Sequence, residues 1–371
     1  MIDYKRNRNN IFIFLEIFAQ EGGIQSYVKD ILQAYQGLNL KGEIFLLRDE
    51  KGCDNPFESE LIKFHYLKSK SAWKGRIKLT WLLLVCLVQS RPQKVFCGHI
   101  KLAGLIKILC QGLGIPYTVL TYGKEVWETL PNLERKALES AAEIWTISRY
   151  SGDRLCQANN IPPAKVKILP CVVDGDMFTP DEKPRTLVEK YGLGDAKVLM
   201  TVARLWSGDI YKGVDVTIRA LPEIKKVFPK VKYLVIGRGD DLPRLRQLAK
   251  DLDVADSVIF AGFIPTAELI DHYRVADIYV MPSQEGFGIV YLEAMACGIP
   301  VISGDSDGSA DPLQDGKLGW RVPHRESKAV AAACVEILQG RDQRCNGEWL
   351  RQETLKQFDK KALSEKLKQL I

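Results

Sequence analysis

The stretch Ser283-Gln-Glu285-Gly-Phe-Gly288-Ile-Val-Tyr-Leu-Glu293-Ala-Met-Ala-Cys-Gly298-Ile-Pro300 places two glutamates eight positions apart around a Gly-Phe-Gly turn. The apolar run before it, 277–282, ends at a proline and indicates a buried strand. The sequence therefore predicts a strand–turn–helix unit, with Glu285 on the turn and Glu293 within the helix. At 1.5 Å per residue, Glu293 lies about 7 Å along the helix axis from Gly288.

This arrangement suits an elongated anionic ligand. One carboxylate can meet the reacting end of the ligand while the other holds a more distant part. The N–H groups at the start of the helix, near Gly286, Phe287 and Gly288, favour an anion between the two. A nucleotide sugar has this anatomy of sugar, diphosphate and ribose. Taken alone, the stretch is also compatible with a surface turn followed by an amphipathic helix.

The two glutamates with seven residues between them, including Gly-Phe-Gly, and the following Ala-Met-Ala-Cys-Gly-Ile-Pro resemble the signature of the retaining glycosyltransferases of family 4, or glycosyl transferases group 1. The resemblance runs from the turn at Gly22 and Gly23 to the last helix and is most specific in the C-terminal half. It implies the GT-B fold, an α/β architecture of two Rossmann-like parallel-sheet domains facing each other across a cleft.

The chain has 371 residues, of which 46% are hydrophobic and 26% charged, which is ordinary for a globular protein of two domains. Strand-like runs alternate with helical patterns, and this favours parallel α/β sheets. The resemblance divides the chain into an acceptor-binding domain, an interdomain linker, a nucleotide-sugar-binding domain and a closing helix that returns to the first domain. The corresponding residues are 1–175, 176–195, 196–358 and 359–371.

Individual elements are predicted from apolar runs and from helical periodicity. The expected strands are 11–18, 43–47, 94–97, 117–121, 144–148, 198–203, 233–236, 258–260, 278–281 and 300–303. The expected helices are 24–35, 77–88, 101–113, 133–142, 213–227, 242–251, 267–275, the helix after Gly288 and 360–371.

The formal net charge of +6 is concentrated in the first half of the chain. Residues 61–124 contain eleven Lys and Arg and no Asp or Glu. This run is either a solvated face or a surface that contacts an anionic membrane or an acidic acceptor. Nucleic acid is not expected as a partner, because no binding motif accompanies the charge.

Nine cysteines, an odd number without Cys-x-x-Cys spacing, indicate a reduced cytoplasmic setting. The basic residues Lys5, Arg6 and Arg8 before the apolar run 11–19 imitate a secretion signal, but a first strand leading into a glycine turn explains the run better. The uncharged stretch 79–88 is too short to span a bilayer. We therefore expect a cytoplasmic protein, with peripheral attachment to the inner membrane face as an option.

Two cations accompany the first strand of the second half: Arg204 at its end and Lys212 before the next helix. A nucleoside diphosphate gains negative charge as its bond to the sugar breaks, and cations placed where charge develops stabilise the transition state. The family resemblance assigns Arg204 and Lys212 to a diphosphate clamp. The insert 206–211 is a few residues longer than the family pattern.

Further candidates rest mainly on the resemblance. Glycines in the turn after the first strand allow a diphosphate or a sugar to approach the backbone closely. A segment after a later strand matches the family segment whose backbone lies near the nucleotide base. A cleft histidine beside the donor sugar and three residues on the acceptor side complete the set. In the order just given, these are Gly22, Gly23, Gly262, Phe263, Ile264, His99, Tyr122, Lys124 and Glu125.

Asp305-Ser-Asp307 has the spacing that binds divalent cations in another glycosyltransferase fold. In GT-B enzymes arginine and lysine take that role, so the resemblance implies no metal and no cofactor. We interpret the motif as a polar loop. No Gly-x4-Gly-Lys-Ser/Thr motif is present, which disfavours a P-loop phosphotransferase.

Taken together, the sequence predicts a retaining, metal-independent hexosyltransferase of cell-surface polysaccharide or glycolipid synthesis. It would move a sugar from a nucleoside-diphosphate sugar to a hydroxyl of a saccharide or lipid-linked acceptor. Glu285 would hold the donor sugar, Glu293 the ribose, and Arg204 and Lys212 the diphosphate. The alternatives are a nucleotide-sugar epimerase of GT-B fold and a non-catalytic sugar-nucleotide-binding protein.

Overall fold

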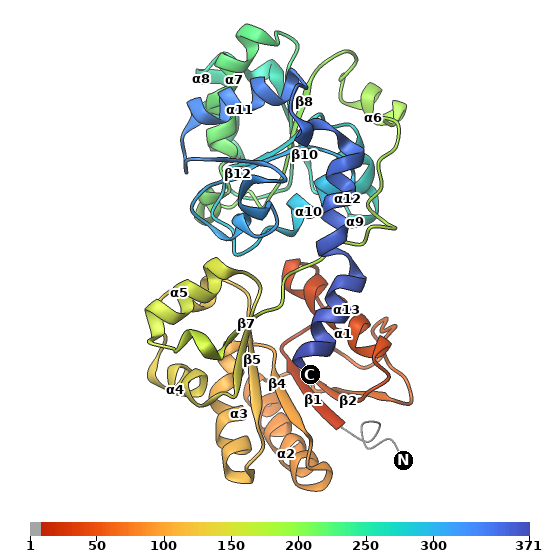
Figure 1. Ribbon diagram of the computed structural model, residues 1–371, viewed down its shortest axis with the longest axis vertical. Helices are drawn as coiled ribbons and strands as arrows, with labels where there is room; N and C mark the ends of the chain where they lie inside the picture. Colours follow the sequence, from red (N-terminus) through yellow and green to blue (C-terminus); the bar gives the residue numbers. More distant parts are fainter. Residues whose placement is uncertain (1–8) are drawn as a thin grey trace. The chain divides into compact units, whose positions relative to one another are not determined.

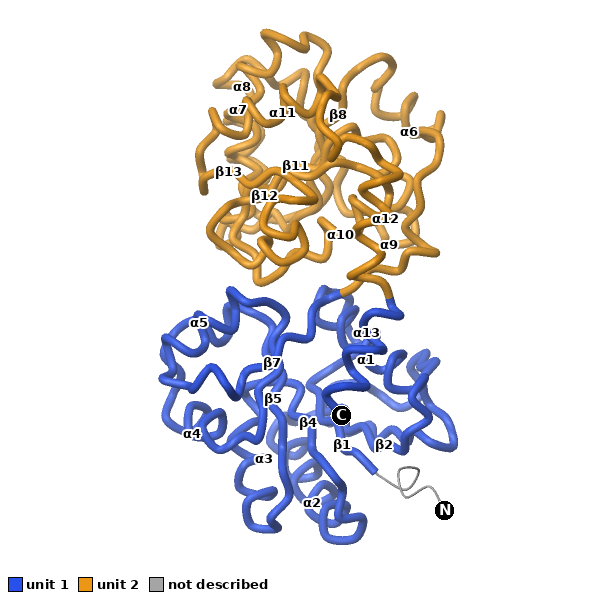
Figure 2. The backbone as a smooth tube through the Cα atoms, in the orientation of Figure 1, with its two compact units in different colours: residues 1–171, 360–371 blue, residues 172–359 orange. Residues whose placement is uncertain are grey.

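The computed structural model describes residues 9–371. The chain forms two compact units, one from residues up to 171 together with 360–371, the other from residues 172–359 (Figure 2). Lys5, Arg6 and Arg8, considered above as part of a signal-like segment, lie outside the described residues.

The first unit is built on a seven-stranded sheet in the order β3-β2-β1-β4-β5-β6-β7, and every neighbouring pair is parallel. The chain order reverses between β1 and β4, as in a Rossmann fold. The strands are β1 Asn9–Phe14, β2 Lys41–Leu46, β3 Ile62–Tyr66, β4 Lys94–Cys97, β5 Tyr117–Thr121, β6 Glu143–Thr146 and β7 Val166–Ile168.

Helices connect most of these strands, whereas residues 47–61 join β2 to β3 without a helix (Figure 1). Leu79, Leu83 and Leu87 of α2 are fully buried and pack with Val95 and Cys97 of β4 in the core of this unit. The helices are α1 Gly23–Gly37, α2 Ala72–Ser90, α3 Ile100–Leu113, α4 Asn132–Ser140, α5 Arg149–Asn159 and α13 Lys360–Leu370, with the 3₁₀ turns η2 Lys124–Val126 and η3 Pro163–Lys165.

The first strand is shorter than the sequence predicts, because it ends at Phe14 rather than at residue 18. The backbone N–H groups of Ile17, Phe18 and Ala19 donate to the carboxylate of Asp49, at 2.7, 3.0 and 2.6 Å. A buried side-chain acceptor thus replaces the strand partner, which apolar periodicity cannot reveal. Helix α2 differs in the other direction, since it begins at residue 72 rather than 77.

The second unit is a six-stranded parallel sheet in the order β10-β9-β8-β11-β12-β13, with the reversal between β8 and β11. Its strands are β8 Val198–Val202, β9 Lys232–Ile236, β10 Val258–Gly262, β11 Ile278–Met281, β12 Val301–Gly304 and β13 Trp320–Val322. The buried faces of β8, β9 and β11 meet α7 and α11 in one apolar core.

The helices of this unit follow their strands in the βα order that the sequence predicts (Figure 1). They are α6 Arg185–Lys190, α7 Val214–Val227, α8 Leu242–Asp251, α9 Thr266–Arg274, α10 Ile289–Ala296, α11 Ser327–Leu338 and α12 Gly347–Phe358. The shorter 3₁₀ elements are η4 Ser207–Lys212, η5 Ala255–Ser257, η6 Gly308–Ala310, η7 Gln314–Gly316 and η8 Gln343–Cys345.

The expected linker, 176–195, lies within the second unit. Arg351 of α12 holds the start of this stretch by donating to the carbonyl oxygens of Gly175 and Phe178, at 2.6 and 2.5 Å. Arg274 donates to the carbonyl oxygen and hydroxyl of Thr179, at 3.1 and 2.8 Å. Arginine side chains thus fix residues 175–179, at the start of the expected linker.

Helix α13 belongs to the first unit, where it packs against α1. Lys94 Nζ donates to the carbonyl oxygen of Leu370 at 3.3 Å and ties the end of α13 to β4. The chain therefore crosses from the first unit to the second after Cys171 and returns after Asp359.

Candidate active site

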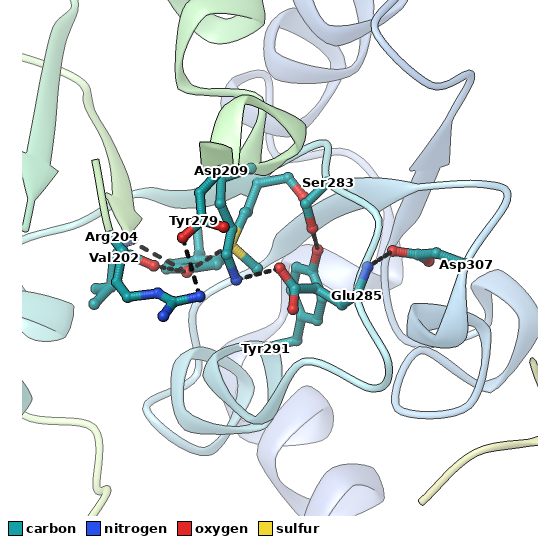
Figure 3. A network of polar contacts seen from close by, with 10 residues as sticks. Val202, Arg204, Asp209, Tyr279, Ser283, Glu285, Tyr291 and Asp307 are labelled. Atoms are coloured by element: carbon teal, nitrogen blue, oxygen red, sulfur yellow. Dashed lines mark hydrogen bonds and ion pairs between the residues drawn. The ribbon is translucent and has the colours of Figure 1, made fainter. Parts of the chain in front are cut away.

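In an open parallel sheet, ligands bind beyond the carboxyl ends of the strands, where the strand order reverses. In the second unit this point lies between β8 and β11. The segment after β8 carries Arg204 and Lys212, and the segment after β11 carries Glu285 (Figure 3). The topology thus brings Glu285 to Arg204 and Lys212, which were selected as a pair from a different part of the sequence.

Lys212 and Glu285 form an ion pair, with Nζ 2.5 Å from Oε1. Their side chains are 17% and 15% exposed. Gly213, at φ 75°, allows the close approach, because a Cβ atom there would lie 2.7 Å from the carbonyl oxygen of Pro282. The start of α7 is therefore pressed against the loop that carries Glu285.

Burial disfavours the charged form of Lys212, but the Glu285 carboxylate, with Tyr211 and Asp209, outweighs it and raises the pKa of the ammonium. Lys212 is consequently a cation throughout the physiological pH range. Opposite charges held this close, with little water around them, attract each other strongly.

Arg204 projects into the same region from the end of β8 (Figure 3). One of its nitrogens lies 3.0 Å from a carboxylate oxygen of Asp209, and its guanidinium lies over the Trp206 ring, 4.8 Å from the centroid. Asp209 and Trp206 both come from the insert 206–211, most of which forms η4. The insert therefore supplies the groups that orient Arg204.

The Gly-Phe-Gly turn is held by its own side chains. Phe287 is 1% exposed and packs edge-on against Phe358, so only its backbone can meet a ligand. Gly288, at φ 93°, leaves no room for a side chain, because a Cβ atom would lie 2.4 Å from the ring of Tyr291. The Tyr291 hydroxyl in turn donates to the carbonyl oxygen of Met281 at 2.7 Å.

Glu293 lies on α10 and is half-buried. Burial raises the pKa of its carboxyl group, and a hydrogen bond from the Tyr273 hydroxyl, 2.6 Å from Oε2, acts in the opposite direction. Hydrogen bonds donated by ligand hydroxyls would favour the ionised form and lower this pKa, so a bound ligand would compensate for the burial. Tyr273, which the sequence analysis did not select, orients the carboxyl group.

The segment 262–264 follows β10 of the same sheet. Gly262 has φ +77°, and the side chain of Phe263 is 55% exposed. The guanidinium of Arg238 lies 4.9 Å from the centre of the Phe263 ring. Arg238 was also not selected from the sequence. It lies within Gly237-Arg-Gly239, and this motif indicates the end of a strand but does not reveal that the arginine stacks on Phe263.

The first unit contains a cavity of about 150 Å³ at its own reversal point, beyond the carboxyl ends of β1 and β4. His99 and Tyr122, two residues selected from the sequence, line this cavity. Ile24 and Gln25, which directly follow the Gly22-Gly23 turn, line it as well. The charged lining residues Glu16, Arg48 and Lys101 were not selected. Their signal was available, because each follows the end of a strand that runs toward the cavity.

His99 caps the first turn of α3, and its Nδ1 accepts a hydrogen bond from the N–H of Lys101 at 3.1 Å. Burial, with the nearby charges of Lys101 and Arg48, lowers the pKa of the ring to about 4. The ring is therefore neutral near pH 7, with its proton on Nε2. His99 can donate one hydrogen bond into the cavity from that atom.

The three acceptor-side candidates differ in their surroundings. The Tyr122 hydroxyl donates to the carbonyl oxygen of Gly98 at 2.7 Å, and its N–H donates to Glu125 Oε1 at 2.5 Å. Glu125 thus closes the turn after β5, whereas Lys124 is exposed. Within residues 9–371, no group of three or more His, Cys, Asp or Glu side chains is arranged to hold a metal ion.

A family model for the glycosyl transferases group 1 matches residues 196–340, which contain Arg204, Lys212, Glu285 and Glu293. Over 266 residues the chain is 34% identical to the GDP-mannose-dependent alpha-(1-6)-phosphatidylinositol monomannoside mannosyltransferase of Mycobacterium tuberculosis, covering 68% of this chain and 66% of the relative. This chain belongs to the glycosyl transferases group 1.

The enzyme of the same description from Mycolicibacterium smegmatis is 40% identical over 232 residues, which are 59% of each chain. This group 1 chain therefore matches about three fifths of the length of the Mycolicibacterium smegmatis relative and about two thirds of the Mycobacterium tuberculosis relative. Among solved structures, a glycosyltransferase from Rickettsia africae superposes with a TM-score of 0.79, covering 98% of this chain and 97% of its own, at 17% identity. The predicted GT-B fold, with its two Rossmann-like domains, is confirmed.

Proposed function

We propose that this chain is a glycosyltransferase that moves a mannosyl group from GDP-mannose to a hydroxyl of a phosphatidylinositol mannoside or a similar glycolipid. The observation that carries the proposal is the Lys212–Glu285 pair beside Arg204, located at the reversal point of the sheet within the segment that the family model matches. The names of the two mannosyltransferase relatives support the choice of donor and acceptor. Neither relative supports the epimerase or the non-catalytic alternative.

The mechanism we infer is a front-face displacement with retention of configuration. The acceptor oxygen bonds to the anomeric carbon on the face that the diphosphate leaves, while the bond from that carbon to the phosphate oxygen breaks. The proton of the acceptor hydroxyl passes to the departing phosphate oxygen, so charge and atoms balance without a metal or cofactor. Arg204 and Lys212 would stabilise the charge that grows on the diphosphate.

Both cations are paired with carboxylates, Lys212 with Glu285 and Arg204 with Asp209. Binding of the diphosphate would replace these carboxylates with phosphate oxygens. This exchange would release Glu285 to hold the donor sugar, so that the catalytic carboxylate is set free only when a donor is present. Glu293, farther along α10, would bind the ribose hydroxyls.

A lipid acceptor agrees with the outer face of α2. Trp73, Ile77 and Trp81 recur every fourth residue, so they form one stripe along the helix, and their side chains are 60%, 59% and 66% exposed. Exposed lysines flank the stripe at positions 70, 74 and 78. Aromatic and aliphatic side chains beside lysines suit the interface of an anionic membrane.

Among residues 9–371, no helix is both long and apolar enough to cross a bilayer. We therefore propose peripheral attachment through α2, at a membrane face where the lipid acceptor is presented. The acceptor head group would enter the cavity of the first unit, where Glu16, Arg48 and His99 offer hydrogen-bonding groups.

The experiment that tests the function follows labelled mannose from GDP-mannose into lipid. Purified chain, GDP-mannose and vesicles containing phosphatidylinositol monomannoside should yield a larger labelled glycolipid, and UDP-glucose should not replace GDP-mannose. Lys212→Ala should abolish most of the transfer. The matched control is Lys317→Ala, which removes a lysine–glutamate pair of the same unit, Nζ 2.8 Å from Glu353, away from the site. Transfer that is equal in both variants would contradict the proposal.

A further inference from the structure

The Asp-x-Asp motif of residues 305–307 has no role in the mechanism above, yet its two carboxylates have very different surroundings. Asp307 is 2% exposed, whereas Asp305 is exposed and its carboxylate accepts only from the adjacent Ser306 hydroxyl among the hydrogen bonds of the described residues. Burial of one carboxylate in a turn needs compensating hydrogen bonds.

Those bonds lead directly to Glu285. Asp307 Oδ2 accepts the backbone N–H of Glu285 at 2.6 Å (Figure 3). The backbone N–H of Gly308 donates to the carbonyl oxygen of Glu285 at 2.8 Å. Both backbone polar groups of Glu285 are therefore bonded to two consecutive residues of the turn after β12.

The rest of the turn is built around this contact. Asp307 Oδ1 accepts from the N–H of Ser309 at 2.9 Å and also from its hydroxyl, so that the second carboxylate oxygen is fixed within the turn. A Cβ atom on Gly308 would lie 2.0 Å from the carbonyl oxygen of Gly286, so only glycine permits the fit. The turn 307–309 and the loop 285–286 thus pack backbone to backbone.

We propose that Asp307 is a positioning residue for the transfer reaction, which sets the place of Glu285 through its backbone and thereby aims the Glu285 carboxylate. This inference rests on the proposed function for its kinetic consequence. Glu285 is on a loop, and its side chain is directed by one ion pair that a donor would displace. Once Lys212 has turned to the diphosphate, only the backbone contacts hold Glu285 in place. A misplacement of about 1 Å at a reacting centre can reduce the rate about 100-fold.

The same contacts give the Asp-x-Asp motif a role that needs no cation. Both oxygens of Asp307 are occupied by backbone N–H groups and a hydroxyl of the chain itself. The backbone carbonyl of Asp305 accepts from Arg321 instead. The pair of aspartates is split between a buried anchor and a surface residue.

The test compares Asp307→Ala and Asp307→Asn with the matched control Asp305→Ala, two residues away in the same motif. In an assay with GDP-mannose and vesicle-borne acceptor, Asp307→Ala should have a kcat about 10- to 100-fold lower than that of the wild-type chain. The dissociation constant for GDP should change by less than about threefold, because the cations that hold the diphosphate are untouched. Asp307→Asn keeps one acceptor oxygen and should lie between Asp307→Ala and wild type. Asp305→Ala should match wild type.

A second readout does not depend on activity. Amide hydrogen exchange in the peptide that contains Glu285 should be faster in Asp307→Ala than in Asp305→Ala, without any nucleotide present. If Asp307→Ala fails to fold, the same two measurements on Asp307→Asn decide. Unchanged amide exchange at Glu285 would overturn the inference. So would an unchanged kcat in an assay in which the wild-type chain is active. An inactive wild type with faster exchange in the variant would instead reject the proposed function and leave the anchoring of Glu285 intact.

Discussion

Lys212 Nζ lies 2.5 Å from Glu285 Oε1, although the two residues are 73 positions apart and come from the loops of different strands. The carboxyl ends of β8 and β11 lie side by side at the reversal of the sheet, and this topology brings Lys212 and Glu285 together. The pair neutralises a cation and a carboxylate that the proposed reaction needs in separate roles. In the proposed reaction a bound diphosphate would replace Glu285 as the partner of Lys212.

The first prediction concerns the diphosphate clamp. Arg204→Ala and Lys212→Ala should each lower turnover by about 100- to 1,000-fold, the usual scale for losing one preorganised group that stabilises developing charge. The thermal midpoint should change little for Arg204→Ala, because this side chain is largely exposed, and should fall for Lys212→Ala, because the carboxylate of Glu285 then loses its partner. Steady-state transfer and thermal melts of the same preparations check this, and near-normal transfer by both variants would remove them from the mechanism.

The second prediction separates the two glutamates. Glu285→Gln should mainly slow the chemical step, whereas Glu293→Gln should mainly weaken donor affinity, since the ribose is held equally in ground and transition states. Single-turnover rates at saturating donor, together with the dissociation constant for GDP-mannose, distinguish the two effects. Equal losses of affinity with equal single-turnover rates would show that the roles are not divided.

The third prediction concerns pH. Burial raises the pKa of Asp307 from 3.8 to about 6, whereas the pKa of His99 is lowered to about 4. The charge of Glu285 raises this pKa further, and Glu285 is itself paired with Lys212. Protonation of Asp307 weakens its bond to the Glu285 N–H, so we expect kcat to fall below about pH 6.

The variants identify which group is responsible for that decline. Asp307→Asn should remove the acid limb, and His99→Asn should lower the rate without moving the limb. The sign for stability is opposite, because a carboxyl group with a raised pKa binds its proton more tightly in the folded chain. The free energy of unfolding that comes from Asp307 should therefore be present below about pH 4 and lost as the pH rises through about 6. Urea titrations of wild type and Asp307→Asn across this range measure it.

The fourth prediction tests the membrane surface. Sedimentation with vesicles should increase with anionic lipid, decrease with salt, and drop when Lys70, Lys74 and Lys78 are changed to Glu. Trp73→Ala with Trp81→Ala should weaken binding at every salt concentration, because burial of apolar surface is not screened.

The control for charge alone changes three exposed lysines of the second unit to Glu, namely Lys197, Lys226 and Lys230. This triple variant should sediment like the wild type. Equal recovery with neutral and anionic vesicles, unaffected by the α2 changes, would exclude the α2 surface as the attachment site.

The fifth prediction follows from the use of Arg204 and Lys212 as the charge-stabilising groups. Prolonged treatment with a chelator should leave transfer largely intact. Complete loss of activity that a divalent ion restores would show that a cation acts in the site, and Asp305 would then be its first candidate ligand.

Much of the fold follows from local patterns, since the apolar runs of β8, β9 and β11 are continuous and buried on both faces. The Arg204, Lys212 and Glu285 set was likewise predictable, because each residue lies at the carboxyl end of a strand. Short strands such as β7 and β13, three residues each, carry too little pattern to be recognised.

Contacts between distant residues could not be predicted from the sequence. Asp49 binds the backbone that follows β1 from 30 to 32 residues away, and Asp307 anchors Glu285 from 22 residues away. Both depend on a buried carboxylate meeting backbone N–H groups, and only the tertiary structure determines which acidic residues are buried. The same holds for Arg351, whose contacts place residues 175–178 in the second unit.

The most direct test of the account is the anomeric configuration of the product made from GDP-mannose and the phosphatidylinositol mannoside acceptor. Nuclear magnetic resonance of the purified glycolipid should show a new α-linked mannose, as in the donor, whose formation is abolished by Lys212→Ala and retained by Lys317→Ala. A β-linked product, or release of free mannose without any new glycolipid, would contradict it.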